Sequence, residues 1–169
     1  METITKEYKV YTIDELSKEA KEKARQAFYE DDNFDFLLDD MYYKLDELLK
    51  ENKITYNDTP KIYYSLSYCQ GDGAMFEGTF FWKKYVINIK QSGHYYHYNS
   101  KEIDIMDEDT GDINNKDDKK FNDIYVSICK QMEKYGYDCI ETYQSEENFI
   151  DMCKANDYNF LESGKMVNY

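Results

Sequence analysis

The sequence predicts an α+β fold: a single domain over residues 1–169, with helices packed on one face of an antiparallel β-meander of about five strands. The first observation is a change of period. Apolar residues recur at helical spacing up to residue 52 and again after residue 119, and at strand spacing from 54 to 106. The second observation is that 169 residues, of which 41% are hydrophobic, are enough to bury one core. Strands covered on one face should alternate apolar and polar side chains, as the middle of the chain does.

The first third of the chain is expected to form a strand over 6–13 and two helices. Asp14 is expected to cap the first helix, whose apolar face would hold Leu16, Ala20, Ala24, Ala27 and Phe28. The second helix is expected over 34–52, with an apolar stripe of Phe34, Leu37, Leu38, Met41, Leu45, Leu48 and Leu49. Its other side carries Asp35, Asp39, Asp46 and Glu47.

Short alternating runs follow, separated by turn signals, and predict the meander. The runs span 54–56, 61–69, 75–82, 85–89, 94–99 and 102–106.

The last third returns to the helical period. Helices are expected over 119–135 and 146–155. Residues 137–142 fit either a strand or an extended connection, and 159–167 fit a hairpin around Ser163-Gly164.

The charge balance limits the classes of partner. The chain has 35 Asp and Glu against 21 Lys and Arg, for a net charge of -14. Such a surface repels phosphate backbones and anionic lipid, so we expect no direct nucleic-acid or membrane binding and instead a basic protein surface as partner. The chain opens without an apolar signal segment and has no apolar run of membrane-spanning length, so a cytoplasmic location is expected. The cysteines form no C-x-x-C pair and are expected to be reduced.

The stretch Gln70-Gly71-Asp72-Gly73 has two interpretations. Asp-Gly between alternating runs is typical of a hairpin turn, because glycine takes positive φ freely. The alternative is a small-ligand site, in which successive backbone N–H groups form an anion-binding nest and Gln70 and Asp72 hold the ligand's polar edge. The turn is the more frequent outcome for such a pattern.

The run GHYYHY contains both histidines of the chain. On the strand expected here, His94 and His97 would point to opposite faces, so no shared metal site is expected. His94, Tyr96 and Tyr98 would line one face, which suits recognition if it is exposed. The alternative is that one tyrosine set packs under the helices.

Other candidate sites are weaker. The acidic stretch 107–118 departs from the calcium-loop pattern, and a solvated turn is expected. Glu77 is a carboxylate within a strand, and Cys69 lies beside the 70–73 loop, whereas Cys129 and Cys153 lie on apolar helical faces and are expected in the core. No catalytic motif is present, so no catalytic residue, metal or cofactor is assigned.

Several stretches together resemble a family of small uncharacterised proteins from bacteriophages and mobile elements: ELSKEAKEKA, SYCQGDGAMFEG, QSGHYYH and NDYNFLESGK. The resemblance runs over most of the chain and brings no catalytic residues with it. It implies a phage gene, a context in which small acidic proteins often inhibit bacterial defence systems, including CRISPR effectors. Some of these inhibitors imitate the phosphate spacing of nucleic acid.

Two functions are therefore expected from different classes. The first is a non-catalytic acidic inhibitor that binds a basic surface, such as that of a nucleic-acid-binding defence effector. The alternative is a nucleotide- or small-ligand-binding domain, sequestering or hydrolytic, with walls at Tyr64, Tyr96 and Trp82. The residues nominated for binding are Gln70, Asp72, Glu77, His94, Tyr96, His97, Asp35, Asp39 and Asp46.

Overall fold

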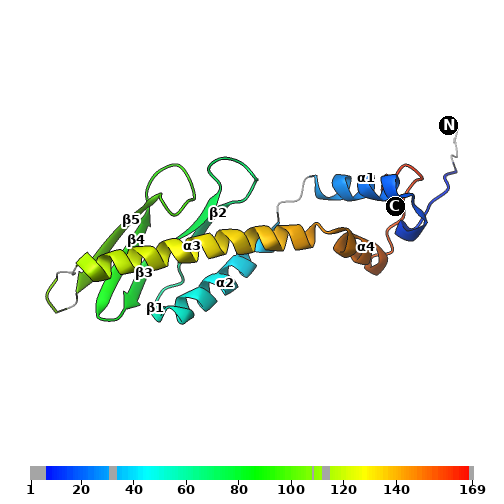
Figure 1. The fold of residues 1–169 in the computed structure, drawn as a ribbon. Coiled ribbons are helices and arrows are strands. Elements are labelled where there is room, and N and C mark those ends of the chain that lie inside the picture. The colour runs from blue at the N-terminus through cyan, green and yellow to red at the C-terminus, as the bar shows by residue number, and fades with distance from the viewer. Residues whose placement is uncertain (1–6, 31–33, 108, 112–114, 168–169) are drawn as a thin grey trace, which may run out of the picture. The chain divides into compact units, whose positions relative to one another are not determined.

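The computed structural model describes residues 7–30, 34–107, 109–111 and 115–167 (Figure 1). The chain divides into two compact units, and each is described by itself. Unit 1 comprises Met1–Phe34 and Ile140–Tyr169, and unit 2 comprises Asp35–Cys139. The predicted α+β class is confirmed, whereas the single domain over 1–169 stays a prediction.

The sheet of unit 2 is antiparallel throughout, and β3 is its central strand. The first half of β3 pairs with β2, and the second half pairs with β1 on one side and β4 on the other, while β4 pairs with β5. The β3–β4–β5 succession is the meander that the alternating runs predicted. The strands are β1 (Ile54–Tyr56), β2 (Lys61–Ser65), β3 (Gly73–Trp82), β4 (Tyr85–Gln91) and β5 (Lys101–Asp107).

One face of this sheet is covered by α2 (Leu37–Glu51) and by α3 (Asn115–Tyr143) (Figure 1). The ring centroids of Trp82 and Phe121 lie 5.5 Å apart, and those of Phe76 and Tyr125 lie 4.8 Å apart. The Tyr125 hydroxyl donates to the Phe76 carbonyl oxygen over 3.1 Å, so its burial leaves no unpaired hydroxyl. Each such ring stabilises the fold by about 1.5–3 kcal/mol relative to exposure.

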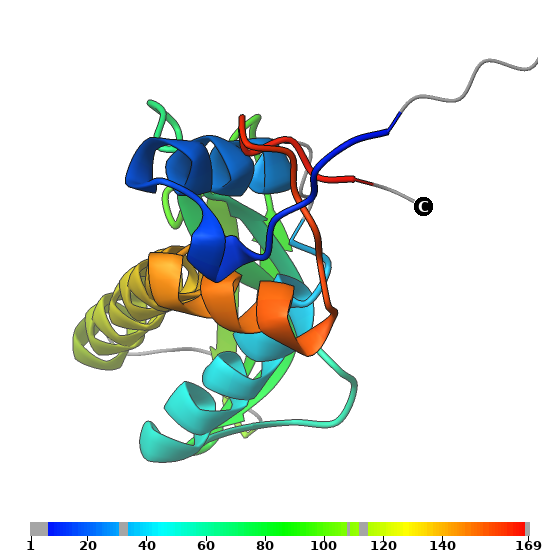
Figure 2. The ribbon, with the colours of Figure 1, turned by 90° about the vertical axis from the view of Figure 1, so that its right-hand side faces the viewer.

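Unit 1 is built from η1 (Ile13–Glu15), α1 (Lys18–Tyr29), α4 (Glu146–Ala155) and the C-terminal segment. Figure 2 shows α1 and α4 side by side, and the rings of Phe28 and Phe149 lie 5.5 Å apart between them. The hairpin expected over 159–167 is confirmed by a bridge between Phe160 and Met166, and Phe160 also bridges to Tyr11. This core therefore joins the two ends of the chain's described part.

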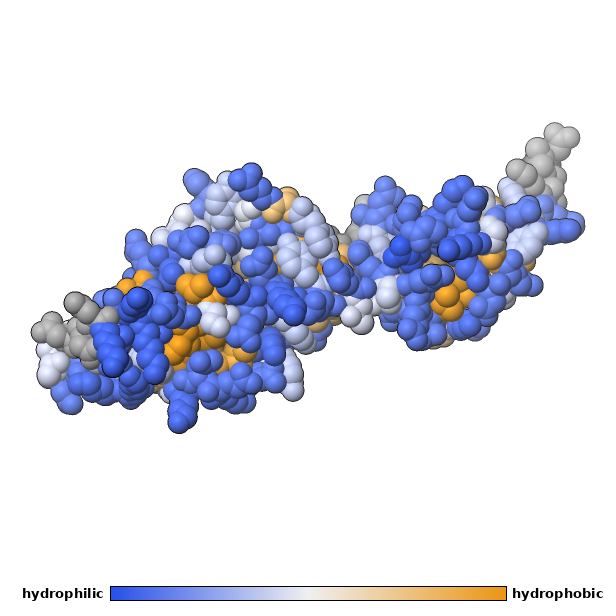
Figure 3. Space-filling view, in the orientation of Figure 1, coloured by the Kyte–Doolittle hydropathy of each residue, from blue (hydrophilic) through white to orange (hydrophobic). Residues whose placement is uncertain are grey.

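Hydrophobic residues are concentrated in one area of the surface of unit 2. In unit 2, hydrophobic atoms gather along the seam between α2 and α3, and mainly hydrophilic atoms surround that seam (Figure 3). No helix in the described part of the chain is long and apolar enough to cross a membrane.

The beginning of the chain differs from its prediction. Within the strand expected over 6–13, residues 7–10 are irregular and only Tyr11 forms a bridge; residue 6 lies outside the described residues. Asp14 belongs to the short helix η1, and Ser17 is the N-cap of α1, its hydroxyl accepting from the Ala20 N–H over 3.2 Å. The predicted cap at Asp14 was therefore wrong, because a single 3-10 turn ahead of a helix has no apolar period that separates it from that helix.

Two further predictions were wrong in unit 2 and at its boundary. Residues 94–99 are bends and turns, not a strand, because this segment folds over glycines of a neighbouring loop. Residues 137–142 continue α3, although Gly136 resembles a helix end. A Cβ at Gly136 would overlap a methyl carbon of Leu66, so packing explains this glycine.

Candidate functional site

Two loops of unit 2 pack against each other at one end of the sheet: loop 66–72, between β2 and β3, and loop 92–100, between β4 and β5. A Cβ at Gly71 would lie 2.8 Å from the ring of Tyr95, and one at Gly73 would lie 2.9 Å from the ring of His97. Gly71 also has a φ of +104°, which side chains disfavour. The structure thus brings together the two stretches that the sequence singled out.

The carboxylate of Asp72 holds loop 66–72 in shape. It accepts hydrogen bonds from the backbone N–H of Ser67 over 2.7 Å and of Cys69 over 3.0 Å. It also accepts from the hydroxyl of Ser65 over 3.0 Å and from the hydroxyl of Tyr137 on α3. The loop is therefore tied both to its own backbone and to a helix distant in sequence.

The pKa values around Asp72 follow from these bonds. Burial alone would raise the pKa of Asp72, but the hydrogen bonds from Tyr137, Cys69 and Ser65 outweigh it and hold that pKa far below its usual range. Burial and the bond to Asp72 raise the pKa of Tyr137 to about 12. At neutral pH the carboxylate is charged and the phenol is neutral, which is the pairing that the bond requires.

Glu77 serves the other loop. Its carboxylate accepts from the Tyr63 hydroxyl over 2.7 Å and from the Gln91 backbone N–H over 3.0 Å, where β4 enters loop 92–100. Burial opposes the shift, but the bonds from Gln91 and Tyr63 and the charge of Lys61 lower the pKa of Glu77. The Tyr63 ring in turn lies 5.3 Å from that of Tyr96. Glu77 therefore supports the loop and is not a carboxylate with a raised pKa, as a general acid would require.

Three tyrosines project from these braced loops, and we call them the tyrosine patch: Tyr68, Tyr95 and Tyr96. Their side chains are 66%, 61% and 42% exposed, respectively. The Tyr68 ring lies 4.7 Å from that of Tyr137, so the patch begins directly above the Asp72 network. Gln70 and His94 are exposed beside these tyrosines in sequence, and His97 is half-buried.

Three aspartates just before α2 and in its first turn form a second acidic group, which we call the α2 acidic end: Asp35 and Asp39, which are exposed, and Asp40, which is half-buried. Burial and the nearby Asp35 carboxylate raise the pKa of Tyr64, which stands just before loop 66–72. None of the three has an ion-pair partner among the residues that the structure describes. Asp46, also nominated from the sequence, differs because it pairs with Lys50 and accepts from the Tyr56 hydroxyl.

The nominated residues are thus partly united. Asp72, Tyr96 and His97 belong to the two loops or their ends, and Glu77 on β3 binds the start of loop 92–100, while Asp35 lies just before α2 and Asp39 in its first turn. Trp82 lies at the opposite end of β3 under α3 and cannot form a wall with them. Sequence reasoning missed Tyr137, because nothing local distinguishes it from other helical tyrosines.

The cysteines are free thiols. Cys69 is exposed, but its Sγ lies 3.2 Å from the Asp72 carboxylate, and this hydrogen bond raises the pKa of the thiol. Burial raises the pKa of Cys129 to about 12 and that of Cys153 to about 11. These thiols are protonated at neutral pH, so they are poor nucleophiles. The predicted core positions of Cys129 and Cys153 are confirmed.

The acidic stretch 107–118 is organised by Asp107, whose carboxylate accepts from the N–H groups of Asp109 and Thr110 and pairs with Lys84. Residues 108 and 112–114 lie outside the described residues. Among the described residues, no group of three or more His, Cys, Asp or Glu could hold a metal ion.

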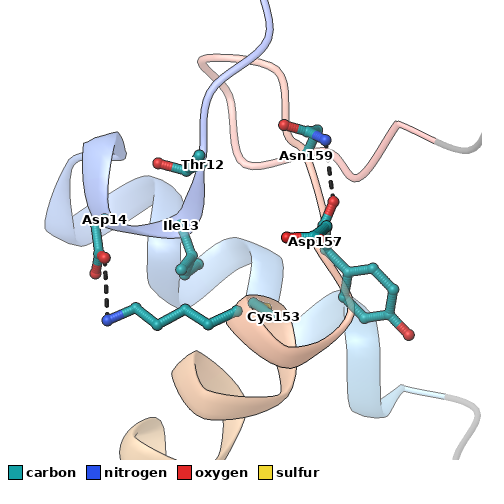
Figure 4. Close-up of a pocket in the computed structure, with 8 residues that line it drawn as sticks. Thr12, Ile13, Asp14, Cys153, Asp157 and Asn159 are labelled. Atoms are coloured by element: carbon teal, nitrogen blue, oxygen red, sulfur yellow. Dashed lines mark hydrogen bonds and ion pairs between the residues drawn. The ribbon is translucent and has the colours of Figure 1, made fainter.

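Unit 1 contains a hollow that the sequence did not indicate, about 470 Å³ in volume, beside η1 and the end of α4 (Figure 4). Asp14 and Lys154 form a 3.0 Å ion pair at its wall, and the Asn159 amide donates to the Asp157 carbonyl oxygen over 3.0 Å. The charges of Asp14 and Lys154 are thus already paired with each other. Its lining residues are Thr12, Ile13, Asp14, Cys153, Lys154, Asp157, Tyr158 and Asn159.

Comparison with protein-family models, curated proteins and solved structures gives no match. The resemblance to phage proteins therefore stays a prediction.

Proposed function

We propose that this chain is a non-catalytic binding protein that contacts a basic protein surface through the tyrosine patch and the α2 acidic end. The observation that carries the proposal is that three exposed tyrosines stand on loops fixed by the Asp72 and Glu77 networks. Tyrosine offers a large contact area and a hydroxyl at low entropic cost. A surface that is already ordered loses less freedom on binding, so more of the contact energy becomes affinity.

The charge of the chain indicates the charge of its partner. The chain carries a net charge of -14, and in the α2 acidic end the carboxylate of Asp35 lies near Tyr64, just before loop 66–72. A basic partner would be drawn to such a surface, and salt would weaken the attraction because exposed charges are screened.

The resemblance to phage proteins supplies the class of target. We propose a phage-encoded inhibitor of a bacterial defence system, for example a CRISPR effector, acting by protein–protein contact or by imitating nucleic acid. The partner surface would be one that normally holds a phosphate backbone, which is rich in Lys and Arg.

The ligand-site alternative has less support. The Asp72 carboxylate already accepts hydrogen bonds from donors of its own chain, and the space above Gly71 and Gly73 is filled by Tyr95 and His97. A ligand would have to displace these groups before it met the backbone of the loop.

Affinity capture from a bacterial lysate tests the proposal. The immobilised wild-type chain should retain a basic protein at low salt and release it at high salt. A Tyr68→Ser, Tyr95→Ser, Tyr96→Ser variant and an Asp35→Asn, Asp39→Asn variant should each retain much less of that same protein. Retention of a small molecule or nucleic acid in place of a protein would contradict the proposal.

Matched control variants distinguish binding through the proposed surface from non-specific binding. Tyr8→Ser with Val10→Ser removes exposed apolar side chains from unit 1, where these residues are 59% and 41% exposed. Glu19→Gln with Glu30→Gln removes two exposed carboxylates from α1 and its end. Both control variants should retain the partner as the wild type does, and equal losses in all variants would count against a defined contact surface.

A further inference from the structure

Strand β5 is an open edge of the sheet in unit 2. Among the described residues, β4 pairs with one side of β5 and no strand pairs with the other. The Gln91 N–H points toward β3, where it donates to the Glu77 carboxylate. In an antiparallel sheet, the N–H and C=O groups of successive residues point toward opposite neighbouring strands, so those of Lys90 and Asn88 point toward β5. Glu102 and Asp104, their register partners, then bond to β4. The N–H and C=O groups of the residues between and beyond them are directed outward, away from β4.

The side chains on the uncovered face of β5 are Glu102, Asp104 and Met106, the last of them 43% exposed. In register, Asn88 stands opposite Asp104 and Val86 stands opposite Met106 on β4. Neither Glu102 nor Asp104 forms an ion pair with any residue in the described ranges. A hollow of about 600 Å³ lies over the face of the β4–β5 pair and reaches β5, and its lining residues are Asn88, Lys90, Glu102, Ile103 and Asp104.

These charges disfavour a second copy of the chain as the occupant. Antiparallel pairing of two β5 strands centred on Asp104 would place two carboxylates directly opposite each other, and like charges in that position are destabilising. The same carboxylates favour a strand that carries basic side chains. The carboxylates therefore favour pairing of β5 with a basic strand over pairing with a second copy of β5.

We propose that β5 binds an extended basic segment of a partner protein by adding it to the sheet as a further antiparallel strand. Residues directly opposite each other share a face, so the segment would carry an apolar residue against Met106 and basic residues against Asp104 and Glu102. Read from its own N-terminus, the recognised pattern is apolar-x-basic-x-basic. This goes beyond the proposed function, because no residue of the tyrosine patch or of the α2 acidic end lines this hollow.

A blocked fluorescent peptide of sequence TVTKTKT is the probe, with titration of the full chain followed by fluorescence polarisation. A control peptide, TVKKTTT, has the same composition and charge, but its adjacent lysines cannot share one face of a strand. We expect TVTKTKT to bind the more tightly and salt to weaken it. Equal affinity of the two peptides, or no binding of either, would overturn the proposal.

Methylation of backbone amides in the peptide tests whether the peptide forms backbone hydrogen bonds with β5. The comparison of charged peptides does not test this. The two threonines that follow the valine and the first lysine would face Ile105 and Ile103 and exchange hydrogen bonds with them. Methylating their amides should abolish binding, whereas methylating the two lysine amides should leave most of it. If both methylated peptides bind alike, the segment does not add as a strand.

Two variants of the chain complete the test. Glu102→Gln with Asp104→Asn should weaken TVTKTKT by roughly two- to fivefold for each carboxylate removed. Asp35→Asn with Asp39→Asn removes the same charge elsewhere and should leave peptide binding unchanged. The second variant also keeps the two proposals apart, since it should lose the basic partner captured from lysate while it still binds the peptide. A loss of peptide binding in that variant equal to the loss in the β5 variant would overturn the assignment to β5.

Discussion

Loop 66–72 and the start of α2 both display aspartates on unit 2, yet the two regions use them differently. Asp72 accepts hydrogen bonds from Ser67, Cys69 and Tyr137, so donors of the same chain already occupy its carboxylate. Asp39 is exposed and has no ion-pair partner in the described part of the chain. An acidic residue is therefore available to a partner only where its own chain does not supply the donors.

The largest effect is expected from Asp72→Ala. The substitution leaves the donors of the loop and the Tyr137 hydroxyl without their acceptor, so the free energy of unfolding should fall by about 2–4 kcal/mol. The pKa of Asp72 is lowered by folding, so its stabilisation is present above the ordinary pKa of 3.8 and is lost as the pH falls through and below that value. Urea unfolding at neutral and acidic pH measures the loss of stability in the variant and its dependence on pH. The wild type should lose more stability than the variant on acidification. Equal stability of variant and wild type at neutral pH would mean that the two regions do not differ as described.

A somewhat smaller loss is expected from Gly73→Ala, which tests the contact between the loops. The new Cβ would lie 2.9 Å from the His97 ring and 3.1 Å from the Tyr96 carbonyl oxygen, so about 1–3 kcal/mol of stability should be lost. His97→Ala removes the ring, and the double variant should lose less than the sum of the single variants. Thermal unfolding of the four proteins measures this, and strict additivity would indicate that the contact does not carry the cost.

Tyr137→Phe removes one hydrogen-bond donor to Asp72. The lost hydrogen bond to a charged acceptor should cost about 1–2 kcal/mol at neutral pH. Folding raises the pKa of Tyr137 from 10.0 to about 12, so this part of the wild-type stability is present below pH 10 and is lost as the pH rises from about 10 to about 12. The stability difference between wild type and variant, measured by urea unfolding, should therefore shrink over that interval. A constant difference would argue against the bond.

The smallest effect is expected from Asp39→Asn. The side chain is exposed and in the first turn of α2, so stability should change by less than about 0.5–1 kcal/mol. Glu19→Gln, in the first turn of α1, is the matched control and should behave alike. A loss as large as that of Asp72→Ala would show that the α2 acidic end is structural and not available to a partner.

Most of the secondary structure could be predicted from the sequence, because helix and strand periods are local properties of a chain. The helix expected over 146–155 matches α4, and that over 34–52 matches α2 within three residues at its start. The Asp-Gly signal placed a turn ahead of β3, and the net charge set the expected sign of the partner. These inferences need only neighbouring residues or a count.

Which side chains contact one another depends on how the whole chain packs. Gly136 resembles a helix end in sequence, yet α3 continues through it because Leu66 packs where a side chain would stand. The run 94–99 has strand-like residues, yet it is a loop because Tyr95 and His97 pack over Gly71 and Gly73. Asp72 and Tyr137 are 65 residues apart, and only the packing of α3 on the sheet brings them together. Contacts between distant residues depend on the whole fold, which no local pattern records.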